Sequence, residues 1–342
     1  MYLVTNGRLI TRDPDGKGYY EHGAVAYEGS QIVEVGEESA LRAKYADAEI
    51  IDAKGGVIMP ALINAHTHIY SALARGLSIV GNNPTNFYEV LDGTWWAIDR
   101  HLMMDGTRAS ATALYMDSIK QGVTTIFDHH ASYGEIPGTL HTIAEESKRL
   151  GLRSCLCYEV SDRDGEEKCL QAIQENADFI SECEKNKDPM LAAMFGGHAL
   201  FTISDKTFDR MVEANNGRTG YHIHVSEGMN DVYDSLQNYG RRPVQRLQDH
   251  GILGEKTILG HCIHVNTAEM EIIKETGTMV VNNPESNMGN AIGICPVLQL
   301  HKRGILLGMG TDAYTNDMLE SLKVALCSQR SQNCLPNVGW CE

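Results

Sequence analysis

His66 and His68 stand one residue apart at the end of an apolar run over residues 56–64. In a β-strand, residues i and i+2 point to the same face, so the two imidazoles would converge on one point. Imidazole is a common ligand for Zn²⁺ and related transition metals. The pair therefore indicates half of a metal site, with two incidental histidines as the alternative.

Ionisable residues also follow other apolar segments farther along the chain. They are His198, His222, His224, Glu227, His261 and Asp312. In a barrel of parallel strands, the carboxyl ends of all strands meet at one face, where the chemistry takes place. A single histidine at a strand end is often only a hydrogen-bonded surface residue. Histidine or aspartate at five of eight strand ends favours one shared site.

The elements that would position these residues begin at residue 57. From there, short apolar segments alternate with longer stretches of helical spacing, which is typical of repeated βα units. We expect eight strands, at residues 57–64, 124–128, 153–159, 191–197, 220–225, 256–260, 278–282 and 304–309. A doubly wound sheet would show a glycine-rich phosphate loop after its first strand, and none is present. The predicted fold class is α/β, with a (β/α)8 TIM-like barrel.

Residues 1–56 differ in texture, because short β-type segments are separated by turn residues. Glu28-Gly29-Ser30 is typical of a tight hairpin turn. We expect a small antiparallel sheet here, the N-terminal part of a β-sandwich-type domain. The barrel would span residues 57–327, and an atypical tail without apolar periodicity would span 328–342.

Composition narrows the function class. The net charge of −16 argues against a nucleic-acid surface, which would show a basic stripe. No apolar run reaches membrane-spanning length, and the N-terminus does not resemble a signal peptide. The nine cysteines do not form a disulfide framework and suit a reducing compartment. We therefore expect a cytoplasmic protein without a nucleic-acid or membrane partner.

Taken together, these motifs resemble the metal-dependent amidohydrolase superfamily, and within it the deaminase and chlorohydrolase branch. The His-x-His pair, the His-x-x-Glu of residues 224–227, His261 and Asp312 carry the resemblance. Longer stretches at residues 59–68, 95–100, 128–132 and 283–288 are similar to SsnA-type aminohydrolases, a subgroup associated with selenium metabolism.

The resemblance implies roles for individual residues. The implied metal ligands are His66, His68, His224 and Asp312. The implied catalytic residues are Glu227, which shuttles protons, His261, which orients the attacking water or the substrate, and Asp312. His224 is preferred to His222 because the family places this ligand three residues before the glutamate. Related two-metal enzymes bridge their ions with a lysine after strand four, and residues 194–202 contain none. We therefore expect one divalent ion, Zn²⁺, with Fe²⁺ as the alternative.

Residues at the predicted mouth are candidates for contact with a small-molecule substrate. The resemblance places His198 there, and His129 and Glu159 follow the second and third strands. His130, Asp162 and Arg163 share this position, and all of these could instead anchor loops. Trp95 and Trp96 could stack on a flat ring or pack in the core.

The expected activity is that of an aminohydrolase or deaminase. A divalent ion lowers the pKa of a bound water from about 15.7 to about 7, which supplies hydroxide at neutral pH. That hydroxide would attack a C–N bond of a small cyclic or amidine-like compound and release ammonia. One alternative is a chlorohydrolase acting on a triazine-like ring. The other is a catalytically silent metal-binding fragment, because few residues follow Asp312 and the chain resembles a truncated family member. Relatives are often homodimers.

Overall fold

The computed structural model describes residues 1–339, which divide into two compact units. The first unit is Met1–Leu62, and the second begins at Ile63. Among the described residues, no helix is long and apolar enough to cross a membrane.

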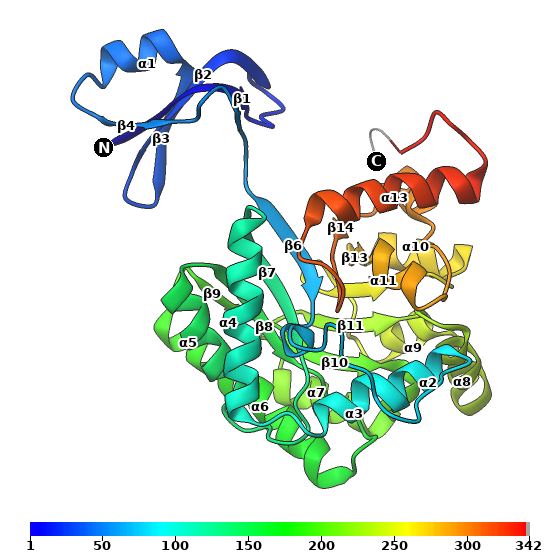
Figure 1. The fold of residues 1–342 in the computed structure, drawn as a ribbon. Coiled ribbons are helices and arrows are strands. Elements are labelled where there is room, and N and C mark those ends of the chain that lie inside the picture. The colour runs from blue at the N-terminus through cyan, green and yellow to red at the C-terminus, as the bar shows by residue number, and fades with distance from the viewer. Residues whose placement is uncertain (340–342) are drawn as a thin grey trace. The chain divides into compact units, whose positions relative to one another are not determined.

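The first unit is a five-stranded sheet with one helix (Figure 1). Its elements are β1 (Tyr2–Ile10), β2 (Tyr19–Glu28), β3 (Gln31–Glu37), α1 (Glu38–Lys44), β4 (Glu49–Asp52) and β5 (Val57–Ile58). The β2–β3 hairpin turns at Gly29, which has a φ of 59°. The prediction of an antiparallel sheet was wrong for two strands, since β4 and β5 both run parallel to β1. Helix α1, which the sequence pattern did not predict, carries the chain back so that β4 can enter in that direction.

Parallel strands form the centre of the second unit. They are β6 (Leu62–Thr67), β7 (Val123–His130), β8 (Arg153–Tyr158), β9 (Leu191–Ala193), β10 (Phe195–Ala199), β11 (Tyr221–Val225), β12 (Ile258–His261), β13 (Met279–Asn282) and β14 (Leu307–Met309). One sheet has the order β6-β7-β8-β9, and the other has the order β10-β11-β12-β13-β14. Single bridges Thr67↔Asp312 and Val160↔Gly197 join the two sheets at both seams. The strands therefore close into a ring, with β9 and β10 together as its fourth member.

The first predicted strand, residues 57–64, is in fact two strands. Val57–Ile58 pairs with β1 of the first unit, and β6 starts at Leu62. Pro60 lies between them, and proline cannot donate to a strand ladder. The apolar run resembles one strand because its hydrophobicity continues through the proline.

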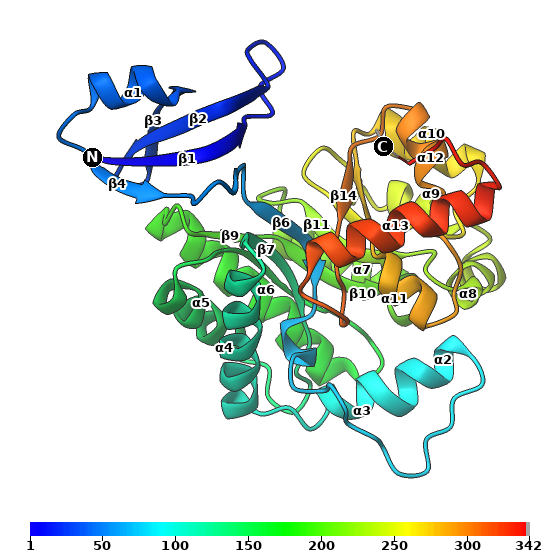
Figure 2. The same ribbon diagram turned by 45° about the horizontal axis from the view of Figure 1, so that its top comes forward.

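Helices follow most of the barrel strands, and Figure 2 shows α13 running beside β14. They are α4 (Met104–Lys120), α5 (Thr139–Leu150), α6 (Glu166–Asn186), α7 (Asp205–Asn215), α8 (Met229–Tyr239), α9 (Pro243–Asp249), α10 (Thr267–Glu275), α11 (Pro284–Gly289), α12 (Val297–Lys302) and α13 (Met318–Asn333). Helix α13 extends into the predicted tail of residues 328–342, because Ser328 and Gln329 are buried and Gln329 donates to the carbonyl of Cys295. Residues 340–342 of that tail lie outside the described residues.

The segment between β6 and α4 differs from the other connections of the described chain, because it contains four short helical elements in succession. It contains η1 (Ile69–Ser71), α2 (Phe87–Val90), η2 (Leu91–Trp95) and α3 (Trp96–Asp99). Below it, the barrel interior is filled by the apolar side chains of Cys155, Cys157, Met194, Ile258 and Val281. All cysteines in the described part of the chain are free thiols.

Candidate metal and catalytic site

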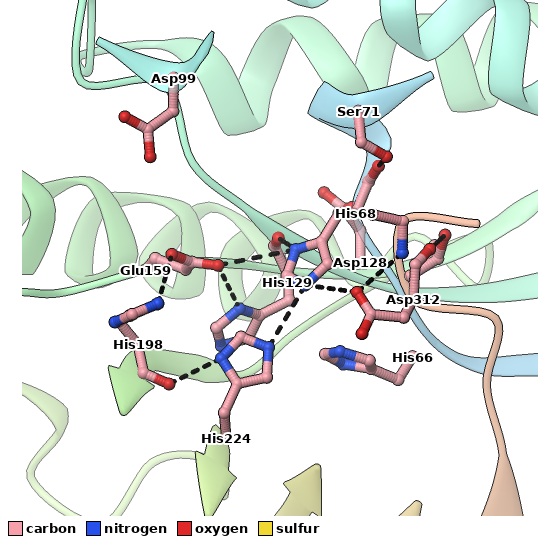
Figure 3. A network of polar contacts seen from close by, with 12 residues as sticks. His66, His68, Ser71, Asp99, Asp128, His129, Glu159, His198, His224 and Asp312 are labelled. Carbon is pink, nitrogen blue, oxygen red and sulfur yellow. Dashed lines mark hydrogen bonds and ion pairs between the residues drawn. The ribbon is translucent and has the colours of Figure 1, made fainter. Parts of the chain in front are cut away.

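The predicted site residues gather at the carboxyl ends of the barrel strands (Figure 3). Three of these strand ends place a residue other than glycine in the left-handed region: Ser226 has a φ of 49°, His261 of 66° and Asp312 of 56°. Such conformations cost about 1–3 kcal/mol each and persist where the surrounding structure enforces them. Here they turn the chain sharply after β11, β12 and β14. The amide of Asp312 then donates to the carbonyl of His66, 3.0 Å away.

Three buried histidines share one hydrogen-bonding pattern. In each, Nδ1 is held by a neighbour: His66 by Nε2 of His222 at 2.8 Å, His68 by the carbonyl of His129 at 2.6 Å, and His224 by the carbonyl of His198 at 2.8 Å. This leaves Nε2 of each ring available. The Nε2 atoms of His68 and His224 lie 3.3 Å apart. Nε2 of His66 is buried without a hydrogen-bond partner among residues 1–339.

Asp312 supplies a carboxylate beside these rings. Its Oδ1 lies 3.2 Å from Nε2 of His68, and its Oδ2 accepts a hydrogen bond of 2.6 Å from Ser286. Burial alone would lower the pKa of His68, but the hydrogen bond and charge of Asp312 raise it to about 9. Burial would raise the pKa of Asp312, but His68 holds it below its ordinary value. The carboxylate of Asp312 therefore stabilises a positive charge beside Nε2 of His68.

The donor set fits a divalent metal ion. His66, His68 and Asp312 have ligand atoms close enough to share one ion, and so do His66, His224 and His261. Burial lowers the pKa of His66 and of His224 well below the ordinary value, so both rings are neutral and can act as ligands. Metal-bound histidines almost always donate their other N–H to a fixed partner, as the three Nδ1 atoms do here.

Glu227 and His261 lie next to this donor set. Nε2 of His261 is 3.5 Å from Oε1 of Glu227 and 3.5 Å from Oδ2 of Asp312. Nδ1 of His261 is held by Oδ1 of Asn287 at 2.7 Å. Burial, and then the charge of Asp312, raise the pKa of Glu227 well above its ordinary value. Glu227 can therefore hold a proton at neutral pH and release it to a neighbouring base.

A pocket opens at these strand ends, and the three residues predicted to contact substrate lie close together at one side of it. Figure 3 shows Glu159 and His198 on one side of the His68–His224 pair and Asp312 on the other. Both Glu159 and His198 line the pocket, whereas His129 lies beneath, fully buried. Oε1 of Glu159 is 3.0 Å from Nδ1 of His129. Burial would raise the pKa of Glu159, but the electrostatic effect of the nearby His198 and the hydrogen bond with His129 lower it to about 2.

The opposite lining of the pocket is mostly apolar and comes from the segment between β6 and α4. It includes Tyr70, Phe87, Leu91, Trp95 and Trp96. Trp96 is almost fully buried, and its ring meets the ring of His198 edge-on at 5.8 Å. Trp96 therefore packs inside the protein and also borders the pocket, whereas stacking of either tryptophan on a flat ring stays a prediction.

The other mouth candidates do not face the pocket. His130 is buried, and burial lowers its pKa to about 3 while its Nε2 contacts the hydroxyl of Ser132 at 3.1 Å. Arg163 forms a buried ion pair with Asp99. Asp162 holds the start of α7, since it accepts hydrogen bonds from the amide of Ser204 and the hydroxyl of Thr207.

Sequence reasoning missed the residues that orient the site. His222 holds His66, Ser286 holds Asp312, and Asn287 holds His261. The sequence did indicate His222 as a candidate, because it shares a strand face with His224. It was set aside because the family places the ligand three residues before the glutamate, which is the position of His224. Ser286 and Asn287 lie within the characteristic stretch at residues 283–288, where nothing in the pattern indicates which partner each would have.

A parallel barrel with buried imidazoles and carboxylates at its carboxyl ends is typical of TIM-barrel metal hydrolases. Comparison with known proteins narrows this class. The chain belongs to the Amidohydrolase family, whose model matches residues 57–339.

Similar curated proteins are deaminases. A 5'-deoxyadenosine deaminase of Methanosarcina barkeri is 30% identical over 94% of this chain and 72% of its own length. A 5-methylthioadenosine/S-adenosylhomocysteine deaminase of Syntrophobacter fumaroxidans is 31% identical over 91% of this chain and 68% of its own length. The comparisons thus support a hydrolase of C–N bonds.

Solved structures agree on the fold. A zinc-bound adenosine deaminase from Xanthomonas campestris superposes with a TM-score of 0.80 at 24% identity, covering 97% of this chain and 74% of its own. A zinc-bound atrazine chlorohydrolase from Arthrobacter aurescens gives a TM-score of 0.83 at 22% identity, covering 99% of this chain and 79% of its own. These likenesses establish the barrel architecture.

Proposed function

We propose that this chain is a mononuclear metal-dependent deaminase that acts on an amino-substituted N-heterocycle of the adenosine type. Water replaces the amino group, so the C–NH₂ bond breaks, a C–O bond forms and ammonia leaves. The observation that carries the proposal is the convergence of three oriented imidazoles and Asp312 next to a proton-holding Glu227. The deaminase relatives support the choice of substrate class.

The metal would be held by Nε2 of His66, His68 and His224 and by a carboxylate oxygen of Asp312. Zn²⁺ suits three imidazoles and one carboxylate, and Fe²⁺ is the alternative. A bound ion would supply Lewis acidity, which lowers the pKa of a water molecule to about 7. The hydrogen bond from Ser286 fixes one oxygen of Asp312 and leaves the other directed at His68.

Glu227 is the proton donor in this proposal. Its carboxyl holds a proton in the resting site, because burial and the nearby Asp312 disfavour its charge. It would pass that proton to the leaving nitrogen, and its position 3.5 Å from His261 keeps it at the reacting face. Because Asn287 fixes the ring through Nδ1, His261 presents Nε2 to the same point and would orient the water or the substrate.

Ammonia release from adenosine and 5'-deoxyadenosine by the zinc-loaded chain tests the proposal. We expect release that stops with a chelator and falls about 10²–10⁴-fold in Glu227→Gln, because a positioned general acid contributes that much. Metal content measured in the same variant serves as the control and should not change. Equal rates in Glu227→Gln and the unaltered chain would contradict the role of Glu227. Chloride release from a chlorinated triazine, without ammonia release from any amine, would indicate a chlorohydrolase.

A further inference from the structure

Two hydrogen-bond acceptors face each other across one wall of the pocket. Oε2 of Glu159 and Nε2 of His198 lie 4.0 Å apart, which is too far for a direct hydrogen bond. Both side chains line the pocket, yet only 3% of Glu159 and 5% of His198 is exposed. Neither atom has a hydrogen-bond partner among residues 1–339.

Hydrogen bonds on the far side of each group determine what these atoms offer. The hydroxyl of Thr202 donates to the carbonyl of Ala199, so Nδ1 of His198, 2.7 Å away, must donate to that hydroxyl. Nε2 of His198 is then a lone-pair acceptor. Oε1 of Glu159 already contacts Nδ1 of His129, which leaves Oε2 as the oxygen that faces the pocket.

His129 cannot supply the missing donor. Its Nε2 lies 3.1 Å from the carbonyl of Gly197 and 3.0 Å from the carbonyl of His222, so this nitrogen must donate to them. Its Nδ1 is directed at Glu159. Both ring nitrogens are therefore committed, so His129 donates to neither Oε2 of Glu159 nor Nε2 of His198, and these two acceptors stay open to a donor in the pocket.

We propose that Glu159 and His198 together bind a second amino group of the substrate, one that stays on the ring when the other leaves. A nitrogen placed about 2.9 Å from each acceptor can bridge a gap of 4.0 Å and donate one N–H to each. The substrate class is therefore a diamino-substituted N-heterocycle, such as a 2,6-diaminopurine. This inference rests on the proposed deaminase function and names the substrate class of the same site.

The position of this wall favours an amino group over a sugar hydroxyl. Oε1 of Glu159 is 3.6 Å from Nδ1 of His68, and the carbonyl of His198 holds His224. The acceptors thus lie next to two of the proposed metal ligands. Because the reacting carbon must lie at the proposed metal ligands, a group bound this close to His68 and His224 belongs, in this proposal, to the ring that carries that carbon. Trp96, edge-on to His198, borders the space that a flat ring would fill.

The test compares ligand pairs that differ in one amino group. Binding of purine riboside and 2-aminopurine riboside to the zinc-loaded chain is measured by calorimetry, and neither compound has a leaving amine. The kcat/KM for ammonia release is measured for adenosine and for 2,6-diaminopurine riboside. We expect the added amino group to improve both values at least about tenfold, because hydrogen bonds to charged groups are strong.

Substitutions of Glu159 test whether this residue causes the preference for the added amino group. Glu159→Gln turns an amide N–H₂ toward the pocket or leaves only a neutral acceptor there, so the preference for the added amino group should fall to about onefold. Glu159→Asp keeps the charge and should retain part of the preference. Glu175→Gln is the matched control, since Glu175 is equally buried but accepts the amides of Gly138 and Leu140 away from the pocket. Thermal melting checks that each variant is folded.

The outcomes separate the two proposals. Absence of ammonia from every compound contradicts the deaminase function, while the binding comparison still decides the role of the wall. Equal binding of the two ribosides, or no measurable binding of either, overturns the inference. Loss of binding on removing the ribose hydroxyls, with no effect of the amino group, would assign the acceptors to the sugar and overturn it as well.

Discussion

At the scale of single residues, the site depends on side chains that hold other side chains. His222 contacts His66 through a 2.8 Å hydrogen bond and does not take part in any of the close ligand groups of residues 1–339. Its pKa is lowered well below the ordinary value, chiefly by burial, so it stays neutral and can accept the Nδ1–H of His66. His66 is thereby fixed with Nε2 directed into the site. We therefore propose that His222 positions His66 and does not itself bind the metal.

We therefore predict that His222→Ala weakens zinc affinity about 10–100-fold, the usual cost of removing the partner of a metal-bound histidine. Competition with a chromophoric chelator measures the affinity. His222→Gln, which can still accept the hydrogen bond, should retain more of it. Unchanged affinity in His222→Ala would show that His66 is oriented by its backbone alone.

The His-x-His pair, the His-x-x-Glu spacing and the strand-end positions of His261 and Asp312 were sufficient to predict which residues converge. They could not predict the partners of these residues, because a hydrogen bond between residues 66 and 222, or 286 and 312, depends on register across the barrel. Local sequence does not encode that register.

At the scale of elements, a chain of ion pairs ties α3 to the loop after β8. Arg163 pairs with Asp99 and, at 3.2 Å, with Asp164, and Asp164 accepts a 2.7 Å hydrogen bond from Arg100. Arg163 also lies over the ring of Tyr133 at 4.1 Å. These contacts hold the segment that carries Trp96 against the pocket.

Arg163→Met should lower the free energy of unfolding by about 3–5 kcal/mol, because Asp99 would remain buried without its partner. Denaturant titration measures the loss, and the added change Asp99→Asn should restore part of it. Arg241→Met removes an exposed ion pair with Asp249 and should change stability little. A loss no larger than in this control would show that the buried pair does not secure α3.

Asp231 links two loops of the site, since its carboxylate accepts hydrogen bonds from the backbone amides of Ser226 and Phe201. Burial raises its pKa from 3.8 to about 7. Between these values the folded chain holds a proton that the unfolded chain has lost, so this group makes the free energy of unfolding fall as pH rises from about 4 to about 7.

The pH dependence of stability in Asp231→Asn should lack this fall. Urea unfolding of Asp231→Asn and of the unaltered chain at several pH values gives the slope of the free energy of unfolding against pH for each. A constant loss of stability caused by the asparagine does not change that slope. Parallel curves would mean that Asp231 titrates near its ordinary pKa in the folded protein.

Strand positions were predictable at this scale, because βα units leave a clear alternation of apolar and helical segments. The segment over residues 69–103 was not, since its helices are short and irregular and lack a sustained period.

At the scale of the whole molecule, the barrel buries several histidines and carboxylates close together at one point. Binding an ion to the folded chain alone stabilises it by mass action. We predict that chelation lowers the thermal midpoint by several degrees and that added Zn²⁺ restores it, as followed by scanning calorimetry. An unchanged midpoint would mean that the ion does not bind to the folded chain.

Metal content of the purified chain, determined by elemental mass spectrometry beside a His66→Ala variant, tests the central claim most directly. One site of three imidazoles and a carboxylate predicts about one divalent ion per chain, largely lost in the variant because one of four ligands is removed. A chain without metal, or a content that His66→Ala leaves unchanged, would contradict a metal site built from these four residues.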